Sequence, residues 1–517
     1  MLRVMALLLV LVMMLPMALA CNKTDDPAKD PNVSGDSDPT GSDKPDDSGN
    51  DGDESDSEVQ VGSAEIEMDM QGYTFEALAR ETEWFSNEVT AEDGTGDQIL
   101  QAVYDRNWAV EEKYNCIMSQ TFITEDHTVS WPIWRNSVSS GESIYKYSLN
   151  HMMQTAQESL NGTMLNLRVL PHINLEAEYW NQSMNKELTI GNKLYFTANE
   201  FCTSSVYFTW LMIFNMKMAE ERDIDVYGMI DDGTWTIDNL YNIASQSYED
   251  DGNATVDFGS DTFGLISYNT TVLTNYIFAF DIPVVHIDAN NEVVMDFNDA
   301  NTPMVTAVEK VYDLFYNSAN GGRLMTDADL SANYSGLLHD NAICTKFSTN
   351  TAIFANTRLL GLETLRTADV QYGIIPFPKL TEEQDGYYSH VDGRGSLIFV
   401  PYTLPANEYE YVGLLLEVLA KKTKEDVMPV IQNAALIGRY SEDSDAYRCL
   451  EMTMNGRTYS FAYVFNSILK TSQPYWSIVN IIKSGSNSFT DFWKAKSRVA
   501  EREINSAMQK YAKANKD

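Results

Sequence analysis

The stretch DQILQAVYDRNWAVEEKYNCIMSQTFI (97–123) decides the fold class. Its first part has apolar residues near helical spacing with charged residues on the other face, which is typical of an amphipathic helix. The apolar residues are Ile99, Val103, Trp108, Val110 and Tyr114. The following NCIMSQTFI (115–123) is predicted to be a strand, and GYTFEALA (72–79) alternates well enough to be an earlier one. A strand, a helix and a strand in this order form a βαβ unit, which predicts a parallel sheet.

Similar alternation recurs along residues 66–517, a length sufficient for two lobes with separate cores. We expect strands in LYFTANEF (194–201) and in VQYGIIPFPKL (370–380), the second after a helix near 358–366. Closing helices are expected at 408–422 and 488–513. The predicted fold class is therefore α/β throughout.

Two short stretches are interpreted as structural devices. Thr236 precedes a helical pattern and can cap it by accepting a hydrogen bond from a free backbone N–H, while Trp235 is expected to pack on that helix rather than stack on a ligand. In YGIIPFPK (372–379) the prolines must end the strand, because proline cannot donate to the ladder.

The N-terminus has the layout of a secretory signal. Arg3 is the only charge in residues 1–20, an apolar run begins at Val4, and small residues precede Cys21. Ala18-Leu19-Ala20-Cys21 resembles the bacterial lipoprotein signal, whose cysteine is lipidated after cleavage. The alternative is an uncleaved transmembrane anchor, but no basic stop-transfer cluster follows the run. We therefore expect a lipid anchor at Cys21 and a location on the extracytoplasmic face of the cell membrane.

Residues 21–65 are expected to form an acidic, disordered tether. Asp, Glu, Ser, Gly and Pro dominate this segment, and it has almost nothing to bury. As a flexible coil it reaches about 35–40 Å. The whole chain carries −39, of which residues 66–517 carry −29. A body this acidic is expected to repel nucleic acid and anionic lipid, which favours neutral or cationic partners.

The cysteines and histidines suggest no cofactor and no metal. Beyond Cys21, the chain has Cys116, Cys202, Cys344 and Cys449, none in a C-x-x-C pair, and sequence leaves open whether they are thiols or disulfides. The six histidines are scattered without metal-ligand spacing.

Several stretches together resemble the extracellular solute-binding lipoproteins of carbohydrate ABC importers, the maltose-binding-like type II group. They are AVYDRNWAVEEKYN (102–115), LEAEYWNQSMNKELTIGNKLYF (175–196), MIFNMKMAEERDIDVYGMIDDGTWTIDNL (212–240) and QYGIIPFPKLTEEQDGYYSHV (371–391), with a weaker one in GRYSEDSDAYRCLEMTMNGRTYSFAYVF (438–465). They sample nearly the whole body in the family's order.

The chain departs from the family pattern at two places. Lys146 follows Tyr145 where the family often has Asp, and YEDDGNATVDF (248–258) breaks the D-x-D-x-D-G spacing of a calcium loop. We therefore expect no EF-hand-like calcium site.

The resemblance implies a type II periplasmic-binding-protein fold with two α/β lobes, a hinge and an interlobe cleft that closes on a solute. We assign residues 1–20 to the signal, 66–200 and 391–445 to the first lobe, and 201–390 and 446–517 to the second. The implied partners are a carbohydrate and the transmembrane subunits of an ABC permease, and the protein is expected to act as a monomer.

The candidate substrate-binding residues lie in loops after predicted strands or near the lobe crossovers, where aromatic rings stack on sugar faces and polar groups bind hydroxyls. They are Arg80, Trp84, Asn150, His151, Trp180, Glu200, Asn356, Arg358, Asp392, Arg394 and Trp476.

Other function classes remain open at this point. A surface glycoside hydrolase needs only two carboxylates a few ångströms apart, and many acids are present, although no H-E-x-x-H, G-x-S-x-G or P-loop motif occurs. The same fold binding a peptide or a cationic solute is a closer alternative, because the body is acidic. An adhesin would tend to show repeats, and none is found. We favour a binding protein over an enzyme.

Overall fold

In a computed structural model, residues 66–81, 87–124, 127–269, 271–290, 292–295, 303–436 and 444–514 are described. The predicted signal segment, Cys21, the tether and Trp84 lie outside these residues. Residues 60–517 form a compact unit of their own. Within the described ranges, no helix combines the length and apolar character needed to cross a bilayer.

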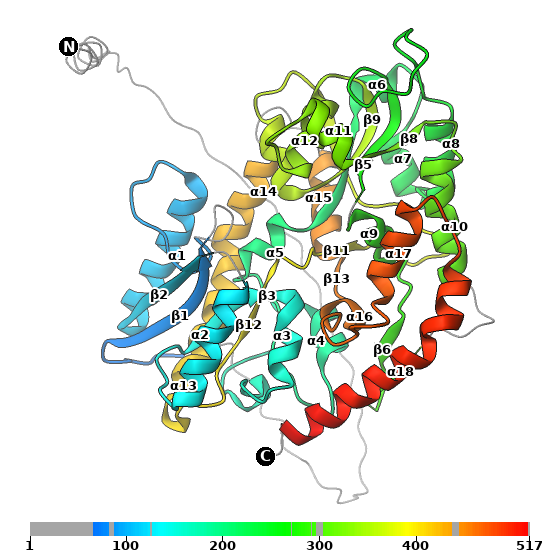
Figure 1. The fold of residues 1–517 in the computed structure, drawn as a ribbon. Helices are drawn as coiled ribbons and strands as arrows, with labels where there is room; N and C mark the ends of the chain where they lie inside the picture. Colours follow the sequence, from blue (N-terminus) through cyan, green and yellow to red (C-terminus); the bar gives the residue numbers. More distant parts are fainter. Residues whose placement is uncertain are drawn as a thin grey trace, which may run out of the picture. The chain divides into compact units, whose positions relative to one another are not determined.

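The first lobe is built on a four-stranded sheet with the order β12-β3-β1-β2 (Figure 1). Strands β1, β2 and β3 are parallel, and β12 returns antiparallel beside β3. The strands are β1 (Tyr73–Glu81), β2 (Cys116–Thr124), β3 (Tyr147–His151) and β12 (Ser396–Phe399). The predicted parallel βαβ unit at the start of the body is confirmed.

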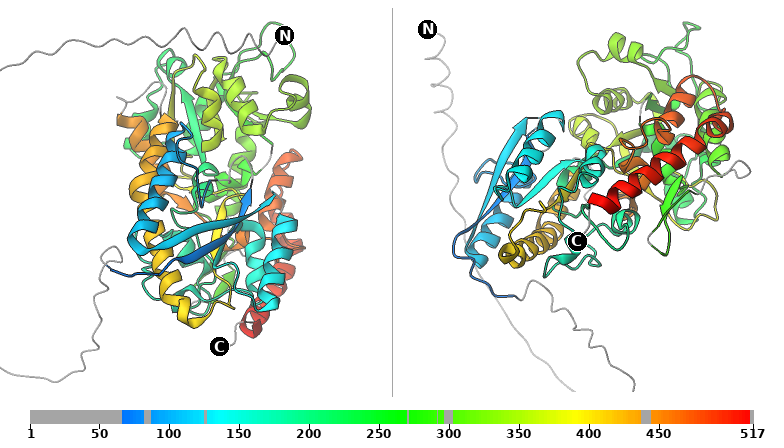
Figure 2. Two further views of the ribbon diagram at one scale, coloured as in Figure 1. Left: turned by 90° about the vertical axis from the view of Figure 1, so that its left-hand side faces the viewer. Right: turned by 60° about the horizontal axis from the view of Figure 1, so that its bottom comes forward.

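Helix α1 (Gln98–Tyr114) connects β1 to β2, and local signals set both of its ends. The side chain of Asp97 accepts hydrogen bonds from two free backbone N–H groups at the N-terminus. Asn115 ends the helix in the left-handed conformation, with φ 49°. Its buried face includes Val103 and Val110, and it lies beside α13 (Tyr409–Lys422), as Figure 2 shows.

The second lobe is built on a five-stranded sheet with the order β10-β4-β9-β5-β8. Strands β5, β8 and β9 run parallel, and β4 runs antiparallel to both β9 and β10. The strands are β4 (Trp210–Asn215), β5 (Phe263–Tyr268), β8 (Gly322–Met325), β9 (Ala352–Arg358) and β10 (Tyr372–Ile375). Every residue of β4, β5, β9 and β10 is buried, as expected for a sheet covered on both faces.

The other elements cover or join these sheets. Helices α2 and α3 pack on the first sheet, while α6, α8, α10, α11, α12 and α15 pack on the second. The remaining helices are α2 (His127–Ser140), α3 (Met152–Ser159), α4 (Gln182–Leu188), α5 (Thr203–Tyr207), α6 (Met216–Glu220), α7 (Val226–Asp231), α8 (Ile237–Ser245), α9 (Val272–Ala279), α10 (Pro303–Tyr316), α11 (Asp327–Asn333), α12 (His339–Ser348), α14 (Met428–Leu436), α15 (Ser444–Asn455), α16 (Phe461–Val464), α17 (Pro474–Lys483) and α18 (Phe489–Ala514). The short elements are η2 (Leu167–Val169), η3 (Leu359–Leu365), η4 (Ala406–Glu408), the π-helix η5 (Thr423–Val427), and strands β6 (Val285–Ile287), β7 (Val293–Met295), β11 (Ser389–His390) and β13 (Arg457–Thr458).

Two chain segments that connect the sheets lie side by side and form the hinge. One leads from α5 into β4, and the other leads from β11 into β12. Thr209 and Val391 form an isolated antiparallel bridge, and the backbone N–H of Asp392 donates to the carbonyl oxygen of Phe208 at 2.9 Å. The lobe limits given as residue ranges above remain a prediction.

Most of the local expectations are confirmed. Thr236 caps α8, Trp235 is fully buried and donates its indole N–H to the carbonyl oxygen of Pro376 (3.0 Å), and β10 ends directly before Pro376. The closing helices α13 and α18 lie where expected. All four cysteines after Cys21 are buried, and none of them forms a disulfide within the part of the chain that the structure describes.

The strand expected at 194–201 is wrong. This segment has only isolated bridges, such as Thr197 with Ile398 and Asn199 with Trp180. All residues of 194–201 are buried, and the segment exchanges backbone hydrogen bonds at single points rather than along a ladder.

A polar network at the hinge as the candidate site

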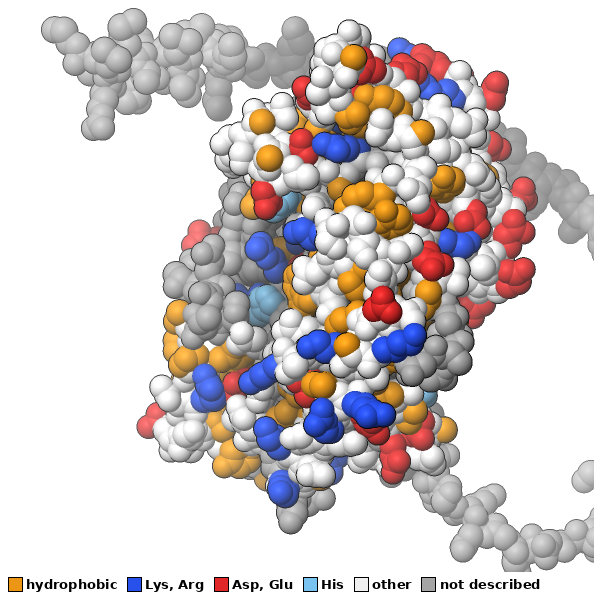
Figure 3. All heavy atoms as spheres, turned by 45° about the vertical axis from the view of Figure 1, so that its right-hand side comes forward, with side chains coloured by type: hydrophobic (Ala, Val, Ile, Leu, Met, Phe, Trp, Pro, Cys, Tyr) orange, Lys and Arg blue, Asp and Glu red, His pale blue; other side chains and the backbone are white. Residues whose placement is uncertain are grey.

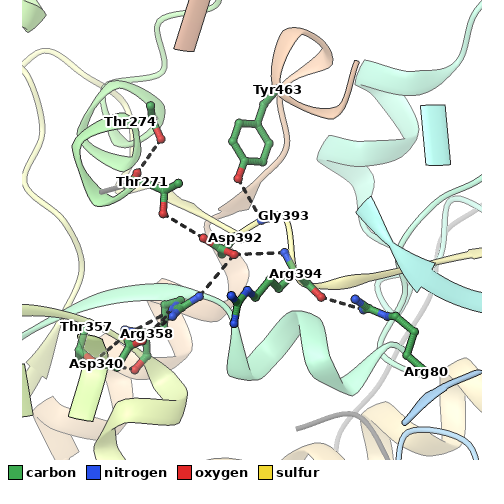
Figure 4. A network of polar contacts seen from close by, with 10 residues as sticks. All are labelled: Arg80, Thr271, Thr274, Asp340, Thr357, Arg358, Asp392, Gly393, Arg394 and Tyr463. Atoms are coloured by element: carbon green, nitrogen blue, oxygen red, sulfur yellow. Dashed lines mark hydrogen bonds and ion pairs between the residues drawn. The ribbon is translucent and has the colours of Figure 1, made fainter. Parts of the chain in front are cut away.

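Four of the predicted site residues converge at the hinge: Arg80, Arg358, Asp392 and Arg394 (Figure 4). Arg80 lies near the carboxyl end of β1, and Arg358 is the last residue of β9. Asp392 and Arg394 lie in the hinge segment that leads into β12. The carboxyl ends of parallel strands from both lobes therefore face the same polar network, as expected for a ligand crevice in α/β folds.

On the second-lobe side, Arg358 is anchored by Asp340 at the start of α12. Arg358 donates from its backbone N–H (2.9 Å) and its Nε (3.1 Å) to the carboxylate, which has no exposed surface. The guanidinium also lies over the rings of Phe208 and Trp210, 5.0 and 5.3 Å from their centroids. Burial alone would lower the pKa of Arg358, but the charges of Asp340 and Asp392 raise it well above its usual value. The arginine is therefore permanently charged and fixed in orientation.

Asp392 connects this anchored arginine to the hinge backbone. Its Oδ1 lies 3.4 Å from Arg358 Nη1 and accepts the backbone N–H of Arg394 at 3.1 Å. Its Oδ2 accepts the hydroxyl of Thr271 at 3.1 Å. The backbone N–H of Gly393 next to it donates to the hydroxyl of Tyr463 at 3.0 Å.

On the first-lobe side, Arg80 has a similar anchor. Its Nη2 donates to the carbonyl oxygen of Arg394 and to Ser396 Oγ, both at 2.8 Å. Ser396 Oγ in turn donates to Glu88 Oε2 (2.7 Å), and Glu88 Oε1 accepts the backbone N–H of Ser204 at the start of α5 (2.8 Å). Burial lowers the pKa of Arg80 to about 10 and raises the pKa of Glu88.

Arg394 differs from the other two arginines. Only its backbone joins the network, and its side chain is exposed. Its guanidinium makes no hydrogen bond or ion pair with any residue that the structure describes. The guanidinium of Arg394 is therefore available to donate hydrogen bonds to a ligand at the hinge.

A cavity of about 260 Å³ adjoins the network through Glu88 and through Leu359, the residue after Arg358. Its walls come from the start of α1, from α5, from η3 and from α14. Its polar lining is Asn87, Glu88, Asp97, Thr203, Tyr207, Glu363 and Arg366. The mixture of carboxylates, an amide, hydroxyls and one guanidinium suits a ligand rich in hydroxyl groups.

Asn150 and His151 end β3 at the edge of the first sheet that faces the hinge. His151 pairs with Ser396 across the β3–β12 ladder, which brings it next to the Arg80 cluster. Asn150 is 1% exposed, and its Oδ1 accepts hydrogen bonds from Ser130 Oγ (3.1 Å) and from the backbone N–H of His151 (2.8 Å). The hydrogen bonds of Asn150 therefore stabilise the end of β3, whereas His151 is half-buried.

Trp180 and Glu200 line a different groove, of about 390 Å³. The indole N–H of Trp180 donates to Glu417 (2.7 Å) and its ring is buried. Glu200 lies 2.7 Å from Arg457 and 3.9 Å from Lys424.

Two further predicted residues are separate from the network. Asn356 is fully buried in β9 and accepts the hydroxyl of Tyr276 at 2.9 Å, and Trp476 lies half-buried on α17. A ligand role for these residues, as for Trp84, stays a prediction.

Sequence reasoning missed Glu88, Thr271, Asp340 and Ser396. An acidic residue in the first turn of a helix, as Asp340 is, is ordinarily explained by the helix dipole, so nothing local marks it as the partner of an arginine. Among the described residues, no group of three or more His, Cys, Asp or Glu side chains is arranged to hold a metal ion.

Comparison with solved structures defines the class of fold. The cyclic α-maltosyl-1,6-maltose binding protein of Arthrobacter globiformis matches with a TM-score of 0.52 at 11% identity, over 84% of this chain and 99% of that one. The ABC substrate-binding protein Lmo0181 of Listeria monocytogenes, in complex with cycloalternan, matches at 0.50 and 11%, over 85% and 99%. UspC of Mycobacterium tuberculosis matches at 0.50 and 11%, over 84% and 100%.

These likenesses show the fold, an α/β two-lobed periplasmic-binding-protein fold, and confirm the predicted fold class. The coverage extends over almost the whole of each matched protein, so the likeness is to a complete two-lobed body. No family model and no curated protein matches the chain by sequence.

Proposed function

We propose that this protein is the substrate-binding component of an ABC importer, which captures a carbohydrate between its lobes and delivers it to a permease. The two-lobed fold with a polar network at the hinge carries this proposal. Two of the proteins that share the fold are described as a binding protein for a cyclic maltosyl-maltose and as an ABC substrate-binding protein in complex with cycloalternan. Lipidation of Cys21 would hold the protein at the extracytoplasmic face of the membrane as a monomer.

The ligand contacts that we propose are the exposed guanidinium of Arg394, the imidazole of His151, and the polar lining of the adjoining cavity. Arg80, Arg358 and Asp392 are already engaged in the network, so their proposed role is to position the hinge and the rim of the site. Trp84 remains a proposed stacking residue. The bonds already made by Arg80, Arg358 and Asp392 keep the rim of the site ordered, which lowers the cost of ordering side chains when a ligand binds.

The test is calorimetry and thermal shift of residues 21–517 against monosaccharides, oligosaccharides and short peptides. A binding protein gives saturable binding, a raised melting temperature and an unaltered sugar. Release of shorter sugars would indicate a glycoside hydrolase, and saturable peptide binding without sugar binding would replace the carbohydrate by a peptide. An Arg394→Gln variant should weaken sugar binding about tenfold or more if the guanidinium donates to the ligand.

A further inference from the structure

Helix α18 carries the opposite charge from the rest of the body. It holds six Lys and Arg residues against three acids, a net charge of +3 in a body that carries −29. The basic residues are Lys494, Lys496, Arg498, Arg502, Lys510 and Lys513. Figure 3 looks onto the side that carries α18, and Lys and Arg side chains gather on its lower part, whereas Asp and Glu gather towards the right and upper edges. We call the six residues, with the neighbouring Lys470, the basic face.

The cations of the basic face lack a neutralising partner among the described residues. None of the seven forms an ion pair with a residue that the structure describes, and all except Lys496 are exposed. Elsewhere basic side chains commonly have a carboxylate partner, as in Lys146 with Glu408 (2.7 Å) and Arg448 with Asp231 (2.7 Å). Unpaired cations of this number on and beside one helix make a positive field that an anionic partner would complete.

Of the two acids between Arg498 and Lys510, Glu501 is exposed, whereas Glu503 is committed to the protein itself. Glu503 accepts hydrogen bonds from the backbone N–H groups of Thr471 (2.8 Å) and Ser472 (3.2 Å) and from Ser472 Oγ (2.8 Å). These three bonds lower the pKa of Glu503 against the effect of burial, which raises it. Its carboxylate therefore fixes α18 to the preceding loop rather than offering a free anion.

A groove of about 460 Å³ runs along the same helix. Lys470, Arg502 and Lys510 stand at its rim, and its floor includes the apolar side chains of Leu160 and Val499. Cations above an apolar floor suit a group with an anionic end and a short apolar part. The headgroup region of an anionic phospholipid has this chemistry.

We propose that the basic face docks on an anionic phospholipid surface and so orients the body at the membrane. The choice of a lipid surface rests on charge complementarity and on the 65 residues that precede the described body, whose apolar run ends at Cys21. This step rests on the proposed lipid anchor. Each cation close to an anionic leaflet strengthens binding roughly fivefold, so a net charge of +3 gives on the order of a hundredfold. That is weak for a free protein but sufficient for one held within a tether's reach, where the effective concentration is high.

The experiment uses residues 21–517 with Cys21→Ser, which removes the anchor and keeps the compact unit. Cosedimentation is measured with vesicles of phosphatidylcholine alone and with about a third phosphatidylglycerol. We expect at least tenfold more protein on the anionic vesicles at low salt, with a steep decrease towards physiological ionic strength of about 0.15 M. Equal binding to both vesicles, or no salt dependence, would overturn the proposal.

The matched variants are R498E/R502E and K113E/K217E, which change the net charge equally on different elements and at exposed positions. The first should lose tenfold or more of its binding to anionic vesicles, and the second should keep it. An R498Q/R502Q variant should fall between wild type and the charge reversal. Unchanged vesicle binding by R498E/R502E would refute the assignment to the basic face.

An acidic protein partner is the competing occupant. It would be indicated if wild type were retained on immobilised polyglutamate but not on anionic vesicles, and that outcome rules out the lipid surface. Sugar binding is measured on the same samples. If the protein binds sugar but not anionic vesicles, this inference alone is refuted. If it binds anionic vesicles but no sugar, the proposed function alone is refuted.

Discussion

Asp340→Asn tests whether the hinge network is held by a buried charge pair. Asp340 is fully buried and accepts hydrogen bonds from the backbone N–H of Arg358 (2.9 Å) and its Nε (3.1 Å). The asparagine has nearly the same shape, so little packing is lost. It removes the negative charge and turns one acceptor into an N–H group that faces the donors of the guanidinium.

The size of the effect follows from the surroundings of Arg358. Removing one partner of a buried ion pair costs about 3–5 kcal/mol, because the other charge stays buried without compensation. Arg358 keeps Asp392 at 3.4 Å, so we expect the lower limit, about 3 kcal/mol. The matched control is Asp238→Asn, which breaks an ion pair with Lys310 at an aspartate side chain that is 63% exposed. Exposed pairs contribute below about 1 kcal/mol.

Urea unfolding followed by circular dichroism and by tryptophan fluorescence measures both variants. Coincident transitions would justify a two-state free energy. The expected decrease for Asp340→Asn corresponds to about 3–6 °C in melting temperature, depending on whether the lobes unfold together or separately. If Asp340→Asn costs no more than Asp238→Asn, the argument that a buried charge pair anchors the network is refuted.

Three other predictions concern the packed body. Burial lowers the pKa of His390 to about 3, so the unfolded chain takes up the proton first as the pH falls from about 6.5. Wild type should therefore lose stability relative to His390→Phe by about 1.4 kcal/mol per pH unit until about pH 3. Equal acid sensitivity of the two proteins would contradict this. Trp235→Phe removes a buried hydrogen bond and ring volume and should cost about 2–3 kcal/mol, whereas Trp108→Phe, at a residue that is 53% exposed, should cost under about 0.5 kcal/mol in the same urea experiment. In a Cys21→Ser chain, the four buried cysteines should react with a thiol reagent only after denaturation, because burial raises the pKa of the thiols of Cys116 and Cys344 to about 12; rapid labelling of the native protein would show that a thiol is accessible.

The elements that sequence predicts well are those whose signals are local. Asp97 and Asn115 bound α1 from within the same stretch, and the prolines end β10 where the ladder stops. The wrong prediction of a strand at 194–201 concerns a feature that depends on distant parts of the chain. β12 is the edge strand of the first sheet, and Thr197 pairs with its Ile398 at a single point. How far a segment follows such an edge is set by the path of the chain in the fold, which the local sequence pattern does not contain.

The candidate site follows the same division. Arg80, Arg358, Asp392 and Arg394 could be proposed because each follows a strand or enters one, and strand ends converge. What separates Arg358 from Asn356 is position along one strand: both point to the same face, but Asn356 lies inside the sheet and Arg358 is at its end. The packing of Trp180 depends on Glu417, which is 237 residues away, and no local pattern reveals such a partner.

The network also indicates how the lobes can move. Arg358 is bound to Asp340 within the second lobe, and Arg80 reaches Glu88 through Ser396 within the first. Breaking the buried pair of Arg358 and Asp340 would cost about 3–5 kcal/mol, more than the 1–3 kcal/mol by which a bound ligand typically biases two states.

Bending at residues 391–395 can leave these anchors intact. It exchanges the Asp392 to Arg358 contact at 3.4 Å and a few single hydrogen bonds, each worth about 1 kcal/mol or a little more. These are the bonds from Arg80 to the carbonyl oxygen of Arg394, from Thr271 to Asp392 and from the backbone N–H of Gly393 to Tyr463. The exposed guanidinium of Arg394 then changes its position relative to both lobes, because its backbone is the part that moves. A ligand that holds this guanidinium therefore selects one hinge angle, and the strong pairs on either side keep each lobe rigid while it does so.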